Sequence, residues 1–568
     1  MTGSASDRLD QAIDAAVAGL TAIRRADGSW PGRLSPAATA TGAAVIALRL
    51  ADPVGSTDLV DAAVDWLRRS QDPSGGWGED VGEPATLNAT SIAVAALAFA
   101  APDRAAREIE LGQRKLAELG GREALGDRAR CSLSAVCLRF MAVAGLHDEN
   151  ALSRVPLELA LLPRKLRSKL SFTVPGMMAW GVMDRHRRPA RGLTGLLRRL
   201  GEPRAMAYLD ELVAFEGPNG GFEESPLMSS CVAFGLHRAG VREDIVRHCL
   251  NYLRTTQKAD GSWSVNRDLE IPITAYVAIG VQDACGDPLA EQTVAWFRER
   301  QREGMPMVTG CPAGGWGWAY PSGWPNTGDA TATMLALGRY GLPPDDPAIQ
   351  GGVGWLTAMQ NKDGSWGCFS KDAKITLDAP CSVMSADAVS TLHDVGGLAV
   401  DHPVIQRAVA WFAKSQRADG ALACRWYVGL TAGTAGTLRV LTELGLGTSP
   451  TATRARDWLL AARNDDGGWG PDAGSPSCPE LTAWAMLALL ADPHSDEDIL
   501  ASAAAYLMSA QRAEDGLWTP VVFGIYFLDV LYASDHHANG HALQALARYR
   551  DRCGARVGAE LSELPASP

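Results

Sequence analysis

The sequence lacks long hydrophobic runs, an excess of positive charge and closely spaced cysteine pairs. No stretch of its 568 residues comes near twenty consecutive apolar residues, so no membrane-spanning helix is expected. The opening MTGSASDRLDQAIDAA lacks the basic-then-apolar order of a secretion signal, which predicts a cytoplasmic protein. The net charge of −12 argues against a nucleic-acid partner. The 11 cysteines include no C-x-x-C pair and therefore predict reduced thiols rather than disulfides or a zinc site.

Strand-like alternation is also nearly absent, and a repeat rich in tryptophan and glycine takes its place. The 17 tryptophans and 59 glycines are concentrated in segments such as WLTAMQNKDGSW, which ends at Trp366, and YLRTTQKADGSW, which ends at Trp263. A period of about fifty residues is typical of repeat architectures. Related copies end at Trp30, Trp77, Phe222, Trp316, Leu422, Trp469 and Trp518.

Each copy of the repeat can be interpreted physically. An amphipathic helix ends near the glutamine, and a D-G or G-G turn stops it, because glycine tolerates the left-handed backbone that follows a helix. Ala- and Leu-rich runs such as TSIAVAALAFA then predict a second helix. The sequence therefore predicts an all-α fold of stacked helix pairs. We assign a structural role to the repeat tryptophans Trp77, Trp263, Trp366, Trp469 and Trp518.

These segments resemble the Q-W repeats of the squalene–hopene cyclase and oxidosqualene cyclase superfamily, the class II terpenoid cyclases. Further similarity lies in VPLELALLP from Val155, GGWGWAYPSGWPNTGDATATMLAL from Gly314, MQNKDGSWGCFSKD from Met359 and DGALACRWYVGLTAGTAGTL from Asp419. The resemblance covers nearly the whole chain and is strongest after Trp263. It implies isoprenoid biosynthesis, of the kind found in bacterial secondary metabolism.

The resemblance also implies a division into two α/α barrels of the βγ type, with a substrate cavity between them. The expected γ-like N-terminal barrel spans residues 1–295 and contains a membrane- or substrate-entry segment at 155–192. The expected β-like C-terminal barrel spans residues 296–568 and carries the catalytic acid. The N-terminal helix either stays with the first barrel or joins the second.

The catalytic motif of the family is altered in this chain. Members that protonate an alkene use a D-x-D-D cluster, because a plain carboxylic acid with a pKa of about 3.9 is a weak donor to an alkene. Asn326, Thr327, Gly328 and Asp329 stand at these four positions. With one inserted residue, the segment from Asp329 to Ala332 resembles instead the D-C-T-A of cyclases that open an epoxide. Both alignments leave Asp329 as the acid.

Three interpretations of Asp329 follow from the altered motif. The carboxyl group protonates a more basic group such as an epoxide; or it protonates an alkene with help from Asp378 or Asp387 across the cavity; or the chain has lost classical cyclisation and binds or transforms an isoprenoid in another way. A purely structural alternative is that Asp329 is a helix N-cap. The candidate acid partners are Asn326, Thr327, Asp378, Asp387 and His393, the last lying two residues after Thr391, which occupies the place of the family histidine.

Aromatic side chains of this family line the cavity, since their ring faces stabilise positive charge. Each aromatic candidate is equally compatible with ordinary core packing. The candidates for the lining are Trp318, Tyr320, Trp324, Phe369, Trp426, Tyr427, Phe523 and Tyr526.

A histidine pair near the C-terminus has the spacing of metal ligands on a helix. His537 and His541 are four residues apart, but Asn539-Gly540 between them disfavours a helix. A polar turn or a wall of the cavity is therefore the favoured interpretation. The sequence predicts no metal site and no cofactor, although a diphosphate-bearing substrate would bring Mg²⁺.

Basic residues flank LSFTVPGMMAW in the entry segment. They are Arg164, Lys165, Arg167, Lys169, Arg185, Arg187, Arg188 and Arg191. They suit an anionic membrane face, a substrate diphosphate, or a solvated helix surface. We therefore expect at most weak peripheral attachment, at the inner face of the membrane.

Taken with the resemblance, the sequence predicts a terpenoid cyclase, an isomerase or lyase, that acts on a linear isoprenoid through a carbocation. Asp329 is the expected acid. The alternative is a non-cyclising isoprenoid carrier or transforming protein.

Overall fold

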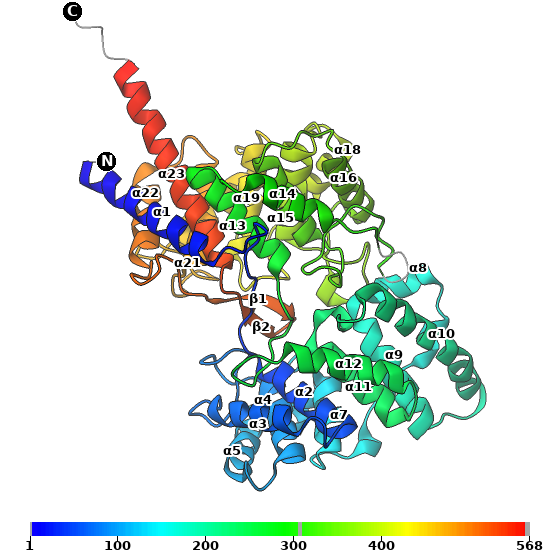
Figure 1. The fold of residues 1–568 in the computed structure, drawn as a ribbon. Coiled ribbons are helices and arrows are strands. Elements are labelled where there is room, and N and C mark those ends of the chain that lie inside the picture. Colours follow the sequence, from blue (N-terminus) through cyan, green and yellow to red (C-terminus); the bar gives the residue numbers. More distant parts are fainter. Residues whose placement is uncertain (1–2, 305–308, 563–568) are drawn as a thin grey trace, which may run out of the picture.

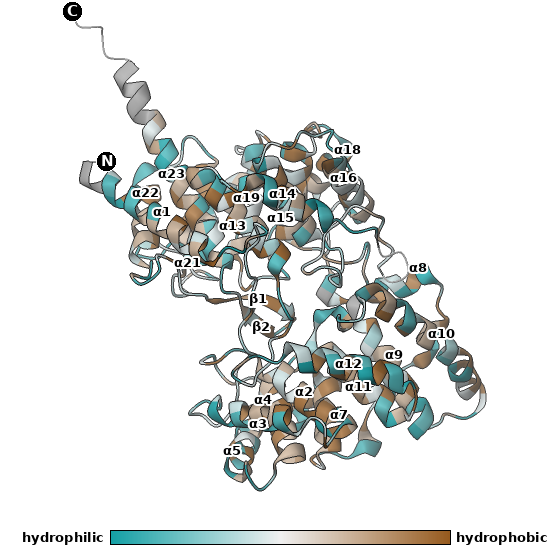
Figure 2. Ribbon diagram, in the orientation of Figure 1, coloured by the Kyte–Doolittle hydropathy of each residue, from teal (hydrophilic) through white to brown (hydrophobic). Residues whose placement is uncertain are grey.

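The computed structural model describes residues 3–304 and 309–562, and most of them are helical. The helices form two barrels, with a two-stranded antiparallel sheet of β1 (Val522–Phe527) and β2 (Val530–Ala533) between them (Figure 1). The predicted all-α double barrel is thus confirmed. Figure 2 shows hydrophobic residues on helices throughout both barrels and hydrophilic residues concentrated on peripheral helices and loops.

In the described part of the chain, six inner helices close the second barrel into a ring, because each packs against a neighbour on both sides. Inner helices such as α21 are buried almost all round, whereas outer helices such as α18 bury only one face. The inner ring consists of α13 (Glu270–Cys285), α15 (Thr327–Arg339), α17 (Ser382–Ser390), α19 (Thr431–Glu443), α21 (Pro479–Leu490) and α23 (His537–Ser562). The outer ring consists of α14 (Ala290–Glu299), α16 (Pro347–Met359), α18 (Pro403–Ser415), α20 (Pro450–Ala461), α22 (Glu497–Ser509) and α1 (Gly3–Ile23).

The first barrel is built from the intervening chain. Its core helices are α2 (Ala38–Ala51), α4 (Leu87–Ala100), α7 (Ser134–Val143), α9 (Val174–Arg187) and α11 (Pro226–Ala239). Outside them lie α3 (Thr57–Arg69), α5 (Ala106–Glu118), α10 (Gly192–Glu216) and α12 (Glu243–Thr256). Short helices complete the connections: α6 (Gly121–Gly126), α8 (Arg164–Arg167), η1 (Glu149–Ala151), η2 (Leu157–Leu161), η3 (Ser168–Thr173), η4 (Phe222–Glu224), η5 (Thr376–Asp378) and the π-helical η6 (Thr391–Val395).

The boundary between the barrels differs from the predicted one at residue 295. Helix α13 packs against α15 and α23, and α14 packs against α15, so both belong to the second barrel. The chain therefore passes from one barrel to the other between α12 and α13. Helix α1 packs against α23 and α13, which places the N-terminal helix in the second barrel. The physical reason is that the inner ring closes only when α13 fills the space between α23 and α15. Helices α1 and α14 then cover the outer side of this part of the ring.

The repeat glutamines join consecutive outer helices. Gln360 follows α16, and its amide nitrogen donates to the carbonyl of Gly364 in its own turn and to that of Val404 in α18, both at 2.9 Å. The indole nitrogen of Trp366 donates to the Leu356 carbonyl at 2.8 Å and returns the turn onto its own helix. The same pair of glutamine bonds recurs at Gln71, Gln257, Gln301, Gln416 and Gln511.

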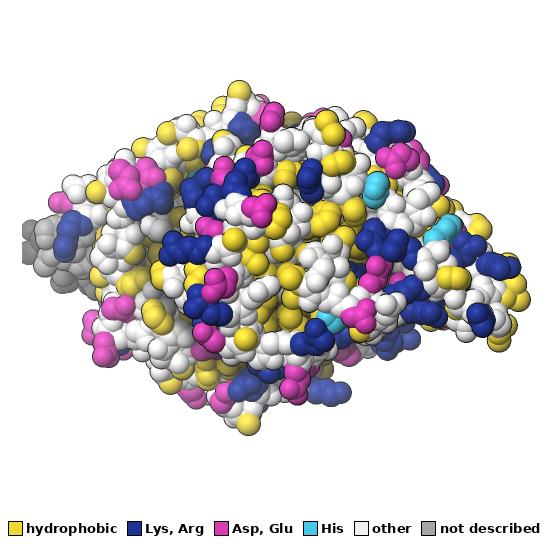
Figure 3. All heavy atoms as spheres, turned by 90° about the horizontal axis from the view of Figure 1, so that it is seen from below, with side chains coloured by type: hydrophobic (Ala, Val, Ile, Leu, Met, Phe, Trp, Pro, Cys, Tyr) yellow, Lys and Arg dark blue, Asp and Glu magenta, His cyan; other side chains and the backbone are white. Residues whose placement is uncertain are grey.

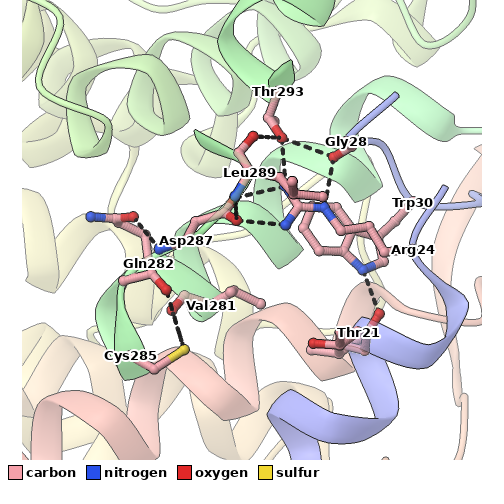
Figure 4. Close-up of polar contacts among 12 residues, drawn as sticks. Thr21, Arg24, Gly28, Trp30, Val281, Gln282, Cys285, Asp287, Leu289 and Thr293 are labelled. Carbon is pink, nitrogen blue, oxygen red and sulfur yellow. Dashed lines mark hydrogen bonds and ion pairs between the residues drawn. The ribbon is translucent and has the colours of Figure 1, made fainter. Parts of the chain in front are cut away.

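The first repeat replaces this glutamine with Arg24, which stands six residues before Trp30 (Figure 4). Its Nε donates to the Gly28 carbonyl at 3.1 Å, and its Nη2 donates to Oγ1 of Thr293 in α14 at 2.6 Å. Nη1 and Nη2 also bind the Asp287 carboxylate at 2.5 and 2.8 Å. Burial opposes ionisation of Asp287, but hydrogen bonds from Arg24 and Tyr340 outweigh it and lower the pKa. Arg24 thus attaches α1 to α14 and closes the outer ring.

We predict that Arg24→Ala destabilises the protein by about 3–5 kcal/mol, because it leaves the Asp287 carboxylate buried without its cation. The side chains of Arg24 and Asp287 are 6% and 0% exposed. Arg25→Ala is the matched control: this neighbour is 41% exposed, and its ion pair with Glu270 contributes about 0–1 kcal/mol. Urea unfolding followed by circular dichroism measures both. Equal losses in the two variants would contradict the closing role of Arg24.

Candidate active site

A cavity lies where the two barrels and the hairpin meet. Asp329 enters it from α15 of the second barrel, Glu223 from η4 of the first, and Tyr532 from β2. Most of its wall is apolar or aromatic. Among the described residues, the lining consists of Leu34, Glu223, Val265, Asn266, Leu269, Pro272, Ile273, Tyr276, Trp318, Asn326, Gly328, Asp329, Cys368, Phe369, Met384, Trp426, Tyr427, Ile525, Tyr526, Tyr532 and His537.

Asp329 lies in the first turn of α15 and lines the cavity. The N-cap is Asn326, whose Oδ1 accepts the backbone N–H of Asp329 at 3.0 Å, so the interpretation of Asp329 itself as the cap is wrong. The Asn326 amide also donates to Oδ2 of Asp329. Burial raises the pKa of Asp329 to about 7, against the opposing effect of the Asn326 hydrogen bond. Near neutral pH this carboxyl group is therefore protonated in a large share of molecules.

Thr327 and Asp378 hold the loop that follows Trp366, away from the acid. The Thr327 hydroxyl donates to the Gly367 carbonyl at 2.7 Å. The Asp378 carboxylate accepts the backbone N–H groups of Cys368, Phe369 and Ser370 at 2.7–2.9 Å. Neither residue is part of the cavity lining. Thr327 and Asp378 were predicted to be acid partners, but their side chains form hydrogen bonds with the loop backbone. They position Phe369.

Asp387 and His393 also lie outside the cavity lining. Asp387 pairs with Arg439 at 2.9 Å in a second, polar chamber inside the same barrel. Burial raises the pKa of Asp387, and Arg439 opposes the shift. The Nδ1 atom of His393 lies 2.8 Å from the Leu398 carbonyl, in the π-helical turn after α17. Among the described residues, the hydrogen bonds to Asp329 from these five candidates come from Asn326.

Five of the eight predicted aromatic residues line the cavity: Trp318, Phe369, Trp426, Tyr427 and Tyr526. Phe369 makes edge contacts with Trp318 and Trp426, with ring centroids 5.7 and 5.6 Å apart. The hydroxyl of Tyr526 donates to Ser225 at 2.8 Å. These rings present π-faces and edges that can accommodate a positive charge inside the cavity.

The other three aromatic residues lie elsewhere. Tyr320 is 39% exposed, and the guanidinium groups of Arg300 and Arg302 each lie 5.6 Å from its ring centroid. Trp324 is fully buried behind Phe369. Phe523 stacks on Tyr427, with centroids 4.5 Å apart, and supports that ring from outside the main cavity.

The cavity lining also contains two tyrosines and a second acid that the sequence does not single out. Tyr276 and Tyr532 lie on α13 and β2, outside the repeat turns that guided the prediction. Glu223 is 2% exposed, and its Oε1 has no hydrogen-bond partner among the described residues. Burial and the neighbouring Glu216 raise the pKa of Glu223 well above its usual range. Its backbone has a φ of 60°, an uncommon conformation for glutamate. Glu223 is thus a second buried acid of the cavity, from the other barrel.

The C-terminal histidine pair does lie on a helix. Helix α23 begins at His537 and continues through Asn539-Gly540. The Asn539 side chain accepts the Trp518 backbone N–H at 2.8 Å. A Cβ on Gly540 would lie 2.6 Å from the Tyr276 backbone, so glycine permits the close contact between α23 and α13. His537 forms part of the cavity wall, and Glu480 lies behind it with His541.

Glu480, His537 and His541 form the group in the described residues that could hold a metal ion, because three of their ligand atoms lie within 4.8 Å of one another. Burial favours the neutral form of Glu480, yet the two imidazoles outweigh it and hold the pKa of Glu480 well below its usual range. Tyr276 packs on both histidine rings, with centroids 4.8 and 4.6 Å away.

Sequence comparison identifies the family. The model of the squalene-hopene cyclase N-terminal domain matches residues 13–181, and that of the C-terminal domain matches residues 274–551. The chain belongs to the squalene–hopene cyclase family. A squalene–hopene cyclase of Bradyrhizobium diazoefficiens is 26% identical, and the alignment covers 96% of each chain. A probable squalene–hopene cyclase of Sinorhizobium fredii is 25% identical, with coverages of 96% and 97%.

Solved structures of class II terpene cyclases share the fold. The ent-copalyl diphosphate synthase of Streptomyces platensis has a TM-score of 0.61 at 18% identity, over 96% of this chain and 99% of that chain. Abietadiene synthase of Abies grandis has a TM-score of 0.53 at 13% identity, over 99% of this chain and 60% of that chain. Throughout residues 3–304 and 309–562, no helix is both long and apolar enough to cross a membrane. The family consists of terpenoid cyclases, so the predicted enzyme class is supported at that level.

Proposed function

We propose that the protein is a class II-type terpenoid cyclase in which Asp329 delivers the proton that starts carbocation cyclisation of a linear isoprenoid. The observation that carries this proposal is the position of Asp329: a buried carboxyl group, protonated near neutral pH, at the wall of a cavity lined by aromatic rings. Water would quench a carbocation, and the mostly apolar lining disfavours it. The proton step needs no metal, although a substrate diphosphate would bring Mg²⁺ with it.

An epoxide is the group that suits this acid best. A carboxyl group with a pKa near 7 is a weaker acid than an ordinary aspartate, and the residue at the centre of the family's D-x-D-D cluster is Gly328, which cannot donate. The Asn326 amide stabilises the Asp329 carboxylate that remains after donation. An epoxide oxygen accepts a proton more readily than an alkene carbon. We therefore favour a terminal epoxide on the substrate over a plain alkene.

A panel of substrates tests both the proton donor and the group that it protonates. Purified protein is incubated with squalene, oxidosqualene and C15–C20 polyprenyl diphosphates, with and without a terminal epoxide, and products are identified by mass spectrometry. We expect a cyclic product from an epoxide, and a loss of more than about 100-fold in Asp329→Asn, the size expected for an acid catalyst. Because Asp329 must be protonated, the rate should be constant below pH 7 and fall above it.

Glu223→Gln distinguishes the two buried acids of the cavity. If Asp329 is the donor, this variant keeps the product and the decline above pH 7. A product that persists in Asp329→Asn and disappears in Glu223→Gln would assign the proton to Glu223. Tight binding of one substrate without turnover of any would favour the non-cyclising carrier.

A substitution at Gly328 can restore the central acid of the family's D-x-D-D cluster. A Cβ on Gly328 would lie 3.2 Å from Cε and Sδ of Met384, a flexible side chain that can shift. We expect Gly328→Asp to place a second carboxyl group beside Asp329 and to raise the rate with plain alkenes relative to epoxides. Gly328→Asn fills the same space without an acid and is the matched control. An equal change in both variants would exclude an acid effect.

We also propose weak contact with an anionic membrane through the 155–192 segment and the start of α10. Leu193, Leu196 and Leu200 are 71%, 53% and 56% exposed. Exposed Arg164, Lys165 and Arg191 lie in the same segment, whereas Arg185, Arg187 and Arg188 form ion pairs within the protein. Figure 3 shows Lys and Arg side chains beside hydrophobic ones toward the end of the molecule where α10 lies.

This proposal predicts co-sedimentation with phosphatidylserine vesicles that weakens at high salt. Leu193→Ser combined with Leu196→Ser should reduce the bound fraction, because it removes apolar area from the contact. Val54→Ser, an exposed apolar residue on the loop before α3, is the control. Binding that is equal on neutral vesicles, or unchanged in the double variant, would refute the contact.

A further inference from the structure

Glu480, His537 and His541 converge between two adjacent inner helices of the second barrel. Glu480 lies in the first turn of α21, and the two histidines lie one turn apart on α23. The Oε1 atom of Glu480 is 3.0 Å from Nδ1 of His537 and 3.1 Å from Nδ1 of His541. Glu480 is 1% exposed, and the side chains of the histidines are 13% and 10% exposed. A carboxylate and two imidazoles thus meet in the protein interior.

Ordinary hydrogen bonding leaves part of this cluster unsatisfied. Among the described residues, neither Nδ1 of His537 nor Oε2 of Glu480 has a hydrogen-bond partner, although the Nδ1 atom lies 3.0 Å from Oε1. The Trp484 indole donates to Oε1 at 2.6 Å and fixes the orientation of the carboxylate. A buried nitrogen that lies close to a carboxylate without an aligned hydrogen bond is costly. A metal ion bound to both groups from one side would remove that cost.

The geometry points to a binding site for a divalent first-row transition metal ion, held by Glu480, His537 and His541. Imidazole nitrogens and carboxylate oxygens bind such ions at about 2.0–2.2 Å, so two ligands of one ion lie about 3 Å apart at a right angle. The separations of 3.0 and 3.1 Å match this value. Two imidazoles and one carboxylate form a donor set that suits Zn²⁺, Fe²⁺ or Co²⁺ better than Mg²⁺ or Ca²⁺.

The surroundings leave room to complete the coordination. Glu480 and His537 also line a small cavity beside the cluster, together with Ser534, whose buried hydroxyl has no hydrogen-bond partner in the described part of the structure. This hydroxyl is the candidate for a further ligand, directly or through a water. The Nδ1 atom of His541 lies 3.2 Å from the His537 carbonyl, so metal binding requires that its proton be on Nε2. The ion would lie behind the His537 ring, in the wall of the main cavity.

This inference does not depend on the proposed cyclisation. The ion would join α21 to α23 in the inner ring and fix the position of His537 in the wall, whatever reaction the cavity supports. The site differs from a diphosphate-borne Mg²⁺ site, because its ligands are imidazoles within the barrel.

Metal analysis of the tag-free protein tests the site. We expect about one equivalent of a divalent transition metal per chain after dialysis. Chelation should lower the thermal midpoint, and added Zn²⁺ or Co²⁺ should restore it. The cobalt protein should show the visible absorption of a nitrogen-ligated ion. Glu480→Gln and His541→Ala should each weaken Co²⁺ binding more than about 100-fold. Loss of a residue that only supports a metal ligand already weakens binding by up to about 100-fold, so loss of a direct ligand should cost more.

His536→Gln is the matched control, because this neighbouring histidine contacts Asn539 and is not part of the cluster. It should bind Co²⁺ like the unaltered protein. If a ligand variant does not fold, the chelation and cobalt measurements on the unaltered chain still decide the matter. The site is refuted if the unaltered protein holds no metal and neither ion changes its spectrum or thermal midpoint. It is also refuted if both ligand variants bind as the control does.

Discussion

The hydrogen bonds of the repeat glutamines determine the architecture. One side-chain amide must satisfy two carbonyl groups, one in its own turn and one at the start of the next outer helix, as Gln360 does. Buried carbonyl groups without partners are costly, so each outer helix is placed relative to the previous one by a short, directional contact. The indole N–H of the tryptophan that follows donates to a carbonyl of the preceding helix and holds the turn against that helix. The inner helices are buried almost all round and have little directional preference of their own, and they take their positions from this outer frame.

Much of the fold could be predicted because the repeat encodes it locally. The D-G turn, the glutamine and the tryptophan recur, and each has one physical role. The division into barrels could not be predicted in the same way, since α13 and α14 have the composition of any other helix pair and are assigned only by ring closure. The replacement of glutamine by Arg24 likewise becomes intelligible only when Asp287 and Thr293 are found beside it.

The candidate site was predictable where residues follow the repeat turns and unpredictable elsewhere. Phe369 and Trp426 follow such turns and line the cavity. Tyr276 lies on a helix that is apolar on all sides, so helical periodicity does not indicate which residue faces the cavity. Periodicity likewise does not indicate that Asp387, on α17, lines the polar chamber and lies apart from the cavity that contains Asp329. Asn539-Gly540 suggested a break in the last helix, whereas tertiary contacts with Trp518 and Tyr276 use both residues within it.

The position of α1 has a consequence for how the chain assembles. Helix α1 packs against α23 and receives a hydrogen bond from Gln511, which follows α22, so the second barrel joins the first and last of the described helices. The first barrel, from α2 to α12, is therefore an insertion within the second. On a ribosome, the inserted barrel is complete once α12 (Glu243–Thr256) is made, whereas its host cannot close until α23 (His537–Ser562) follows, and α1 must wait for partners not yet synthesised. During that interval its apolar face is open to chaperones or to another nascent chain.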